Sequence, residues 1–411
     1  MTDIPDPDRR QRGVRASSTE FARYDQVAKP AYHLAESADS ADEFDEEFEW
    51  TTCDLGRFLH GDAADRRAFA ERLGAAMREI GFAILEGHGI DPALFDAAEQ
   101  WVEQFFTTTP DTAKQPFLAA RHGAVREGWF PIEHTSDIHP DQVEAWVFGR
   151  RAFDLDGDPA FDAARHWPRP ELEPRFRAWV EAGTALFEPI AQAILQGLGV
   201  DSHLLDARLA RPNFGLRLNY YPPLEDSADP AAGRLLGHED VDLFTLLPAP
   251  RIEGLQALKR DGRWARLSPP RGTIVLNTGD YLQRLSNDIL PSTTHRVGRP
   301  RDPQVRRRAR VSLPLAAYLR PDELLEVLPG TGAPKYAPIR VITFHTRTTA
   351  KFYGDDYAVE VPVNVAEHGH GSADRAILGP WPPTGRSPSC PSKRCRPTPS
   401  RVGSREGSPR T

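Results

Sequence analysis

The stretch GHEDVDLFTLL, residues 237–247, places a histidine and an aspartate two positions apart and then runs directly into apolar residues. Side chains two positions apart in a β-strand point to the same face of the sheet. His238 and Asp240 could therefore reach one metal ion from a single strand. The spacing alone is weak evidence, because a chain with 13 histidines and 59 acidic residues contains about two such pairs by chance.

Two other pairs in the chain have the same spacing, His60/Asp62 and His139/Asp141. Asp62 stands where a helix is expected to begin and suits the N-cap position of that helix. His139 and Asp141 flank a proline, which indicates a turn. The pair at 238 and 240 differs because it leads into a strand-like run, and a strand holds a site more rigidly than a loop does.

The residues on either side of this stretch predict the fold. From 214 to 320, short apolar runs alternate with Gly, Pro, Asp and Asn, which is typical of the many short strands of a sandwich or barrel. The first half carries longer patterns with helical spacing at 66–81, 92–108 and 171–200, and Pro189 should kink or divide the last of them. We therefore predict an α+β chain with a mainly β core flanked by helices.

The composition sets the domain boundaries. The 411 residues are 39% hydrophobic and 27% charged, the balance of a soluble globular protein. Residues 1–49 include a strongly acidic block, and 366–411 are basic and rich in Pro and Ser, so we expect both to be disordered tails. Between them we expect a helical region at 50–200 and the β core at 201–365.

The charge and the cysteines exclude several classes of protein. A net charge of -8 argues against a nucleic-acid partner, which would need a basic face. We expect no membrane span, because no stretch of about 18 apolar residues exists, and no secretory signal. Cys53 is the one cysteine outside the C-terminal tail, which argues against a disulfide framework and indicates a reducing cytoplasm. The sequence carries no signal of the oligomeric state.

A third metal ligand is available in STTHRVGRP, residues 292–300, where His295 opens another short strand. Two histidines and a carboxylate on one face, with open positions opposite, form the facial triad of non-haem Fe(II) oxygenases. A histidine in isolation is more often an ordinary core or surface residue. Two further strands with polar residues on one face favour the ligand interpretation here.

The first of these strands is RARVSLPL, residues 308–315, in which Arg310 and Ser312 share a face. The planar guanidinium of arginine binds a carboxylate through two parallel hydrogen bonds, and a serine hydroxyl adds one more. The alternative is that Arg310 belongs to an exposed basic run. The second strand is LRLNYYPP, residues 216–223, where Asn219 and Tyr221 share a face and suit a bound acid. The alternative is that Tyr220 and Tyr221 are ordinary aromatic residues of a strand.

The order of these motifs resembles the isopenicillin N synthase-like family of 2-oxoglutarate- and Fe(II)-dependent dioxygenases. LNYYPP, GHEDVDLFTLL, THRV and RVSLP follow one another in the family's order. REIGFAILEGHGI at 78–90 resembles the family's opening helix-to-strand segment, and VREGWFPIE at 125–133 resembles its glycine-containing loop. The resemblance covers about residues 50–360 and implies a double-stranded β-helix, or jelly roll, with flanking helices.

The resemblance also implies the site and the reaction. Fe(II) would be held by His238, Asp240 and His295. The cosubstrate 2-oxoglutarate would bind the iron at one end, and Arg310 and Ser312 would hold its far carboxylate with help from Tyr221 or Asn219. With O2, the enzyme would oxidise a small-molecule substrate and release succinate and CO2. Hydroxylation is the default outcome, and desaturation or ring closure are the alternatives.

Several alternatives stay open at this stage. The chain could be an Fe(II) oxidase of the isopenicillin N synthase type that uses no 2-oxoglutarate, a non-catalytic jelly-roll binding protein, or a zinc hydrolase. Glu239, where plant relatives usually have Thr, adds a charge that we expect near the mouth of the site. The basic connection 298–308 is either a solvated loop or a feature that favours an anionic substrate. Substrate-contacting residues are expected from 121–150, from the helical half and from 336–357. The Arg- and Pro-rich composition suggests specialised metabolism in a bacterium.

Overall fold

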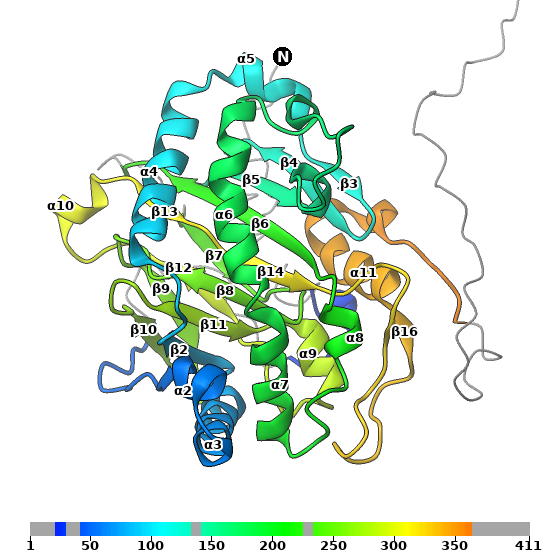
Figure 1. Cartoon of the computed structure of the whole chain (residues 1–411). Helices are drawn as coiled ribbons and strands as arrows, with labels where there is room; N and C mark the ends of the chain where they lie inside the picture. Colours follow the sequence, from blue (N-terminus) through cyan, green and yellow to red (C-terminus); the bar gives the residue numbers. More distant parts are fainter. Residues whose placement is uncertain (1–20, 30–41, 133–140, 225–232, 364–411) are drawn as a thin grey trace, which may run out of the picture. The chain divides into compact units, whose positions relative to one another are not determined.

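The computed structural model describes residues 21–29, 42–132, 141–224 and 233–363 (Figure 1). The predicted C-terminal tail and His139 lie outside the described residues. No helix in the described part of the chain is long and apolar enough to cross a bilayer.

The large sheet has ten strands, in the order β1-β2-β11-β8-β14-β6-β5-β4-β3, with β13 paired to β6 beside β14. Its strands are β1 Thr52–Asp54, β2 Phe82–Glu86, β3 Ala120–His122, β4 Val125–Phe130, β5 Glu144–Gly149, β6 Asn213–Tyr221, β8 Phe244–Pro248, β11 Ile274–Thr278, β13 Arg310–Ser312 and β14 Leu315–Tyr318. A second sheet has the order β10-β9-β12-β7, formed by β7 Leu235–His238, β9 Leu255–Leu258, β10 Trp264–Leu267 and β12 His295–Val297. The two sheets are the jelly roll that the sequence predicted.

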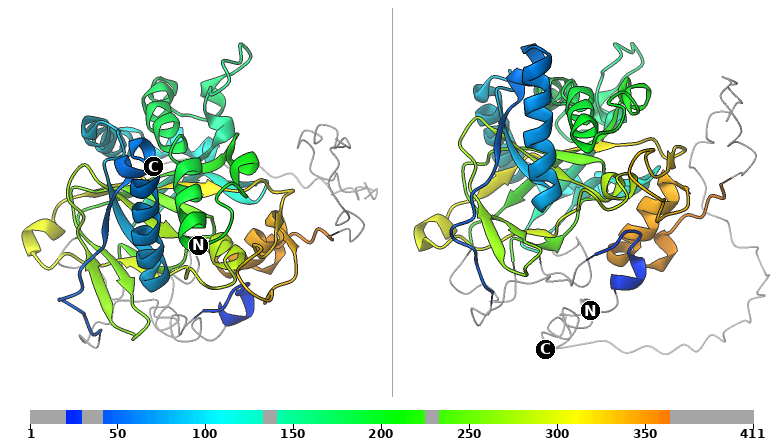
Figure 2. Two further views of the ribbon diagram at one scale, coloured as in Figure 1. Left: turned by 60° about the horizontal axis from the view of Figure 1, so that its bottom comes forward. Right: turned by 90° about the horizontal axis from the view of Figure 1, so that it is seen from below.

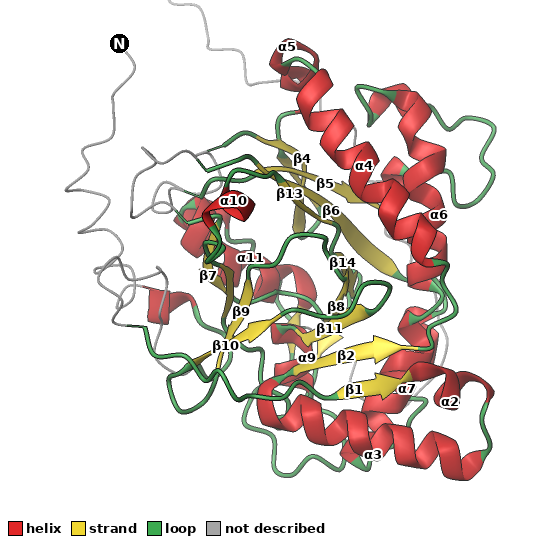
Figure 3. Ribbon diagram, turned by 90° about the vertical axis from the view of Figure 1, so that its left-hand side faces the viewer, coloured by secondary structure: helices red, strands yellow, loops and turns green. Residues whose placement is uncertain are grey.

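The helices flank these sheets, and α4 and α6 pack on one face of the large sheet against β6 and β14 (Figure 3). The α-helices are α2 Leu55–His60, α3 Ala63–Ile80, α4 Pro92–Thr108, α5 Asp111–Lys114, α6 Glu173–Thr184, α7 Phe187–Leu198, α8 Asp206–Leu209, α9 Asp280–Leu285, α10 Pro303–Arg306 and α11 Val341–Tyr353. Short 3-10 turns are η1 Phe21–Tyr24, η2 Gln115–Phe117, η3 Arg150–Ala152, η4 Ala163–Arg165, η5 Pro170–Leu172 and η6 Asp355–Tyr357. A small hairpin joins β15 Leu324–Leu325 to β16 Ile339–Arg340.

The helix signals in the sequence act as predicted. The Asp62 carboxylate accepts hydrogen bonds from the backbone N–H groups of Ala64 and Asp65 at the start of α3, which satisfies donors that have no partner within the helix. The predicted helix 171–200 is divided into α6 and α7. The division falls just before Pro189, because a proline cannot donate to the carbonyl four residues earlier and its ring clashes with that carbonyl.

The region 50–200 is less helical than predicted. It supplies β1 to β5, which extend the large sheet at both of its ends. The segment expected to be a glycine-containing loop is mostly strand β4, paired with β5. Its glycine is required all the same, since Gly128 has a φ of 118° and a Cβ there would lie 2.4 Å from the carbonyl oxygen of Phe117.

The described part of the predicted N-terminal tail is folded. Residues 21–29 run beside α11 (Figure 2), Val27 is buried, and Lys29 forms an ion pair with the buried carboxylate of Asp280. The described end of the acidic block contacts basic residues in and beside the second sheet, since Asp42 pairs with Arg296 of β12 and Asp45 pairs with Lys259, directly after β9. The low hydrophobicity of this segment predicted disorder. The rest of the fold nevertheless buries Val27 and supplies charged partners for Lys29 and Asp45.

A ladder of aromatic rings joins the helices to β5. The rings of Phe148 and Trp167 stack with centroids 3.7 Å apart, and Trp167 in turn stacks on Phe176 of α6. Trp167 is 1% exposed, so this contact contributes strongly to stability.

We predict that Trp167→Ala lowers the free energy of unfolding by about 3–5 kcal/mol, the range for a buried large aromatic residue. Chemical denaturation measures the loss. The matched control is Trp101→Ala, since Trp101 on α4 is only half-buried and should cost clearly less. Equal losses for the two variants would contradict this description of the core.

Candidate metal centre

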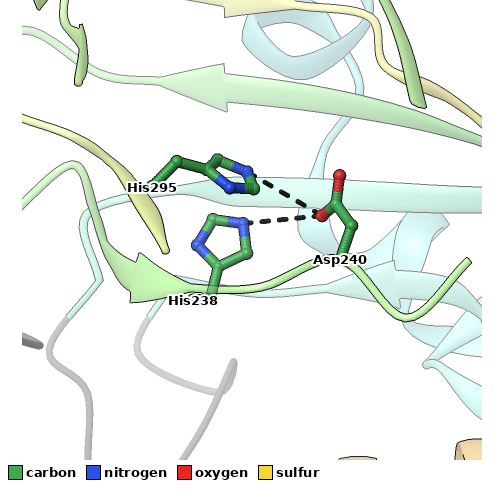
Figure 4. A group of neighbouring side chains, drawn as sticks. All are labelled: His238, Asp240 and His295. Carbon is green, nitrogen blue, oxygen red and sulfur yellow. Dashed lines mark ion pairs between the residues drawn. The ribbon is translucent and has the colours of Figure 1, made fainter. Parts of the chain in front are cut away.

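Strand pairing brings the three predicted metal ligands together. His295 on β12 is the register partner of His238 on β7, although 57 residues separate them in the sequence. The Nε2 atoms of His238 and His295 lie 3.8 and 3.9 Å from Oδ1 of Asp240. All three side chains point toward one another, and their ligand atoms lie within 4.8 Å of each other (Figure 4).

Each imidazole is oriented by a backbone carbonyl. Nδ1 of His238 lies 2.9 Å from the carbonyl oxygen of Leu236, and Nδ1 of His295 lies 3.1 Å from that of Thr293. A carbonyl only accepts hydrogen bonds, so Nδ1 carries the proton in both rings and the lone pair is on Nε2. Burial, and then the charge of His295, lowers the pKa of His238 to about 4, which keeps this ring neutral at physiological pH.

The third ligand is held by its second oxygen. Oδ2 of Asp240 accepts hydrogen bonds from Oγ1 of Thr245 at 2.7 Å and from Nδ2 of Asn277 at 2.8 Å, which leaves Oδ1 facing the two imidazoles. Burial alone would raise the pKa of Asp240, but the two histidines and these hydrogen bonds outweigh it and lower the pKa. Two imidazoles and one carboxylate that converge on one point fit the facial triad of Fe(II) oxygenases.

The predicted anion-binding residues form one group on two paired strands. Arg310 is the register partner of Tyr221, and Ser312 is the partner of Asn219. All four are buried. Nδ2 of Asn219 donates to Oγ of Ser312 at 3.3 Å, and the Tyr221 hydroxyl lies 3.5 Å from the same oxygen.

Arg310 is a cation without a complete set of partners. Its Nε donates to the Ile252 carbonyl at 3.1 Å, whereas its Nη1 is buried with no hydrogen-bond partner among the described residues. Burial lowers the pKa of Arg310. Because an unpaired buried guanidinium is costly, this end of the site is suited to an anion.

Arg234, just before β7, is a second buried cation that sequence reasoning missed. It is 0% exposed, and burial, followed by repulsion from Arg310, lowers its pKa to about 10. Its Nε and Nη1 have no hydrogen-bond partner within the described chain. No sequence signal distinguishes it from a solvated loop arginine.

A cavity of about 220 Å³ joins the metal ligands to the Arg310 group. Strand residues such as Arg217 and Leu247 line it, and so do residues from the predicted segments 121–150 and 336–357. Of the helical half, which was also expected to contribute, no residue of α2 to α7 is among the described lining residues. The lining residues from these two segments are Val125, Arg126, Phe130, Asp141, Val147, His345, Thr349, Phe352 and Tyr353.

Comparison with known proteins agrees with this site. The model of the 2OG-Fe(II) oxygenase superfamily matches residues 212–316, and the model named non-haem dioxygenase in morphine synthesis N-terminal matches residues 51–170. The first contains His238, Asp240, His295 and Arg310. The chain belongs to the 2OG-Fe(II) oxygenase superfamily.

Individual members of the superfamily cover most of the chain. A 2-oxoglutarate-Fe(II) type oxidoreductase, ppzC, of Metarhizium majus is 27% identical over 73% of this chain and 86% of its own length. Isopenicillin N synthase of Streptomyces griseus is 27% identical over 60% of this chain and 79% of its own. The structure of a full-length Neurospora crassa protein in complex with alpha-KG and 5-formyluracil superposes with a TM-score of 0.64, at 25% identity over 77% of this chain and 99% of that one.

The cofactors follow from the match to the 2OG-Fe(II) oxygenase superfamily, from the alpha-KG held by the superposed structure, and from the His–Asp–His group of this chain. Fe(II) is the metal of this enzyme, and 2-oxoglutarate is its cosubstrate. The zinc hydrolase and the non-catalytic binding protein are excluded as alternatives.

Glu239, which lies between the predicted ligands His238 and Asp240, is not at the mouth of the site as expected. It is 3% exposed, accepts a hydrogen bond from Oγ1 of Thr294, and lies 3.4 Å from Nζ of Lys351. Burial would raise its pKa, but Lys29, Lys351 and Thr294 together lower it to about 2. The carboxylate of Glu239 is therefore buried and paired with Lys351, and it does not face solvent at the mouth of the site.

Asp141 was predicted to lie in a turn, but the structure places it in the cavity wall. Its Oδ1 accepts a hydrogen bond at 2.8 Å from the backbone N–H of Leu236. Burial raises its pKa to about 7. The sequence offered no signal for this burial, which results from the packing of β7 against the segment before β5.

Removing a metal ligand should weaken metal binding strongly. Removing a side chain that donates a hydrogen bond to a ligand, as Asn277 does to Asp240, should weaken it less. We predict that His295→Ala binds Fe(II) at least about 100-fold more weakly, and Asn277→Ala about 10-fold to 100-fold more weakly. Anaerobic calorimetric titration measures both. The control is His203→Ala, an exposed histidine paired with Asp206. Unchanged Fe(II) affinity in His295→Ala would refute the assigned centre.

The raised pKa of Asp141 predicts a pH effect on stability. A carboxyl whose pKa is raised by folding stabilises the fold fully at low pH, and this contribution is lost as the pH rises through about 7. Asp141→Asn keeps the acceptor for Leu236 but cannot ionise. We expect the free energy of unfolding to fall less between about pH 5 and pH 8 in this variant than in the parent or in the exposed-site control Asp356→Asn. Parallel pH curves for all three proteins would disprove the assignment.

Proposed function

We propose that this 2-oxoglutarate- and Fe(II)-dependent oxygenase hydroxylates a C–H bond of a small organic molecule. In the proposed reaction, 2-oxoglutarate, O2 and R–H become succinate, CO2 and R–OH. One O2 oxygen enters succinate and the other enters the product. The observation that carries the proposal is one cavity that holds both the His238–Asp240–His295 triad and Arg310, whose buried Nη1 has no hydrogen-bond partner among the described residues.

The metal-binding role belongs to His238, Asp240 and His295. Bound Fe(II) supplies the redox chemistry that couples O2 reduction to oxidation of the cosubstrate and the substrate. The protein holds the metal ligands in place, since backbone carbonyls fix both imidazoles and Thr245 and Asn277 fix the carboxylate. Such support keeps the three ligand atoms in position before the metal arrives.

The role of Arg310 is to hold the far carboxylate of 2-oxoglutarate. Its Nη1 is buried without a hydrogen-bond partner among the described residues, and the hydroxyls of Ser312 and Tyr221 lie beside one another on the paired strands. A carboxylate bound there would accept charge-assisted hydrogen bonds, which are about twice as strong as neutral ones. Asn219 orients Ser312 through its side-chain amide.

Apolar side chains separate these two ends of the site. Leu247, Leu255 and Val297 line the cavity together with the metal ligands, and all three are largely buried. A dry wall strengthens the electrostatic contacts inside the site and limits side reactions with water. We also propose that the enzyme works in a reducing cytoplasm, supported by Cys53, a buried free thiol among the described residues.

An oxidase of the isopenicillin N synthase type is the second candidate, favoured by the 27% identity to isopenicillin N synthase of Streptomyces griseus. In that case Arg310 and Ser312 would bind a carboxylate of the substrate itself. The two candidates differ in whether 2-oxoglutarate is consumed.

The test is a stoichiometric assay of the Fe(II)-loaded enzyme with 2-oxoglutarate and a panel of small molecules. We expect one succinate per O2 consumed, and slow succinate formation without substrate. Arg310→Gln should raise the KM for 2-oxoglutarate by about 100-fold, because it removes a charge-assisted contact. Arg211→Gln, at an exposed arginine paired with Asp156, should not. Consumption of O2 without succinate would establish the oxidase instead.

A further inference from the structure

A third cation lies on the same face of β6 as the cosubstrate residues. Arg217, Asn219 and Tyr221 alternate along this strand, so their side chains share one face, and all three line the cavity. On the neighbouring strand β13, Ser312 is the register partner of Asn219, and Arg310 is the register partner of Tyr221. Arg217 lies beyond this pair, four residues from Tyr221 or about 13 Å along the strand.

Arg217 has a hydrogen-bond donor in the cavity wall that lacks a partner among the described residues. Its Nε donates to Oδ1 of Asn219 at 2.7 Å, which fixes the plane of the guanidinium. Its Nη2 is buried and finds no hydrogen-bond partner in the described residues. A guanidinium held in place with a buried free donor is costly unless an acceptor binds to it.

The carboxylates of the cavity do not neutralise this charge. Asp240 faces the histidines, and Glu239 pairs with Lys351. Asp141 is near enough for Arg217 to influence its pKa, yet its carboxyl accepts from Leu236 and forms no ion pair with Arg217. Asp242 also lines the cavity, and it accepts a hydrogen bond from Thr245 and forms no ion pair with Arg217. Since 2-oxoglutarate is assigned to Arg310, no described carboxylate pairs with Arg217.

A second arginine reinforces this charge. The guanidinium carbons of Arg217 and of Arg126 on β4 each lie 5.7 Å from the ring centroid of Phe130, and Arg126 lies 4.7 Å from that of Tyr353. Burial raises the pKa of Tyr353, and both arginines oppose this rise. Two cations and two aromatic rings therefore form one wall of the cavity.

We propose that the substrate carries a carboxylate that binds Arg217, with Arg126 beside it, and an apolar or aromatic body that packs on Phe130 and Tyr353. This inference rests on the proposed function and adds the substrate class. The planar guanidinium suits the two oxygens of a carboxylate. The aromatic rings offer flat apolar surface to the rest of the molecule. The positive charge in question lies in the cavity wall, whereas the basic connection 298–308 is largely exposed.

The experiment uses the full chain with Fe(II) and 2-oxoglutarate, without O2, and measures the binding of matched probes. The probes are aromatic and aliphatic monocarboxylic acids, each with its primary amide and with a phosphate ester of the same carbon skeleton. We expect the best acid to bind at least about 10-fold more tightly than its amide, the tenfold step of a single charge-assisted contact. Equal binding of acid and amide would overturn the proposal, and so would preference for the phosphate ester over the acid.

Variants show whether Arg217 is the source of this preference. In Arg217→Gln the ratio of acid to amide affinity should fall to near one, and Arg217→Lys should restore part of it. Arg211→Gln, which removes an exposed charge from the same part of the chain, should keep the parent ratio. A purely structural role of Arg217 would change stability but not this ratio, so an undiminished ratio in Arg217→Gln would overturn the assignment.

The two proposals fail separately. Acid binding is measured without turnover, so it can be present even if O2 is consumed without succinate formation, which would refute only the proposed use of 2-oxoglutarate. Conversely, coupled succinate formation together with equal affinity for acids and amides would refute only the carboxylate at Arg217.

Discussion

The antiparallel pairing of β7 with β12 is the contact on which the site depends. It sets His238 opposite His295, and the carbonyls of Leu236 and Thr293 then turn both Nε2 atoms toward Asp240. A slip of one residue would move a histidine to the other face of its strand. The carbonyls orient each ring locally, whereas the strand register decides whether the two rings meet.

The large sheet completes the site from the other side. β6 carries a row of polar side chains along one face, and β13 adds Arg310 and Ser312 in register with it. The two strands give the cavity two cationic side chains, Arg310 from β13 and Arg217 from β6. In our proposals, Arg310 binds the anion needed in every turnover, and Arg217 binds the anion that identifies the substrate. Both charges stay available because no described carboxylate pairs with them.

The triad, the Arg310 group and the helix ends were predictable from the sequence. Local signals such as Asp62 specify a helix start, and the order of several motifs identifies a superfamily. Arg217, Arg234 and Asp141 were not predicted as site residues, because a buried charge and a solvated one look alike in a sequence. Glu239 was misplaced for the same reason. The alternation of residues showed that the Glu239 side chain points away from the metal ligands. It could not show that Lys351, 112 residues away in the sequence, contacts and covers this side chain.

The central claim is that one cavity holds Fe(II) and 2-oxoglutarate on the residues assigned here. Anaerobic titration of the Fe(II)-loaded protein with 2-oxoglutarate, followed by visible absorption, tests it most directly, because chelation of iron by a 2-oxo acid produces a charge-transfer band. We predict that the band saturates at one equivalent of 2-oxoglutarate and that Arg310→Gln shifts the titration to higher concentration. Iron binding without any such band would contradict the claim.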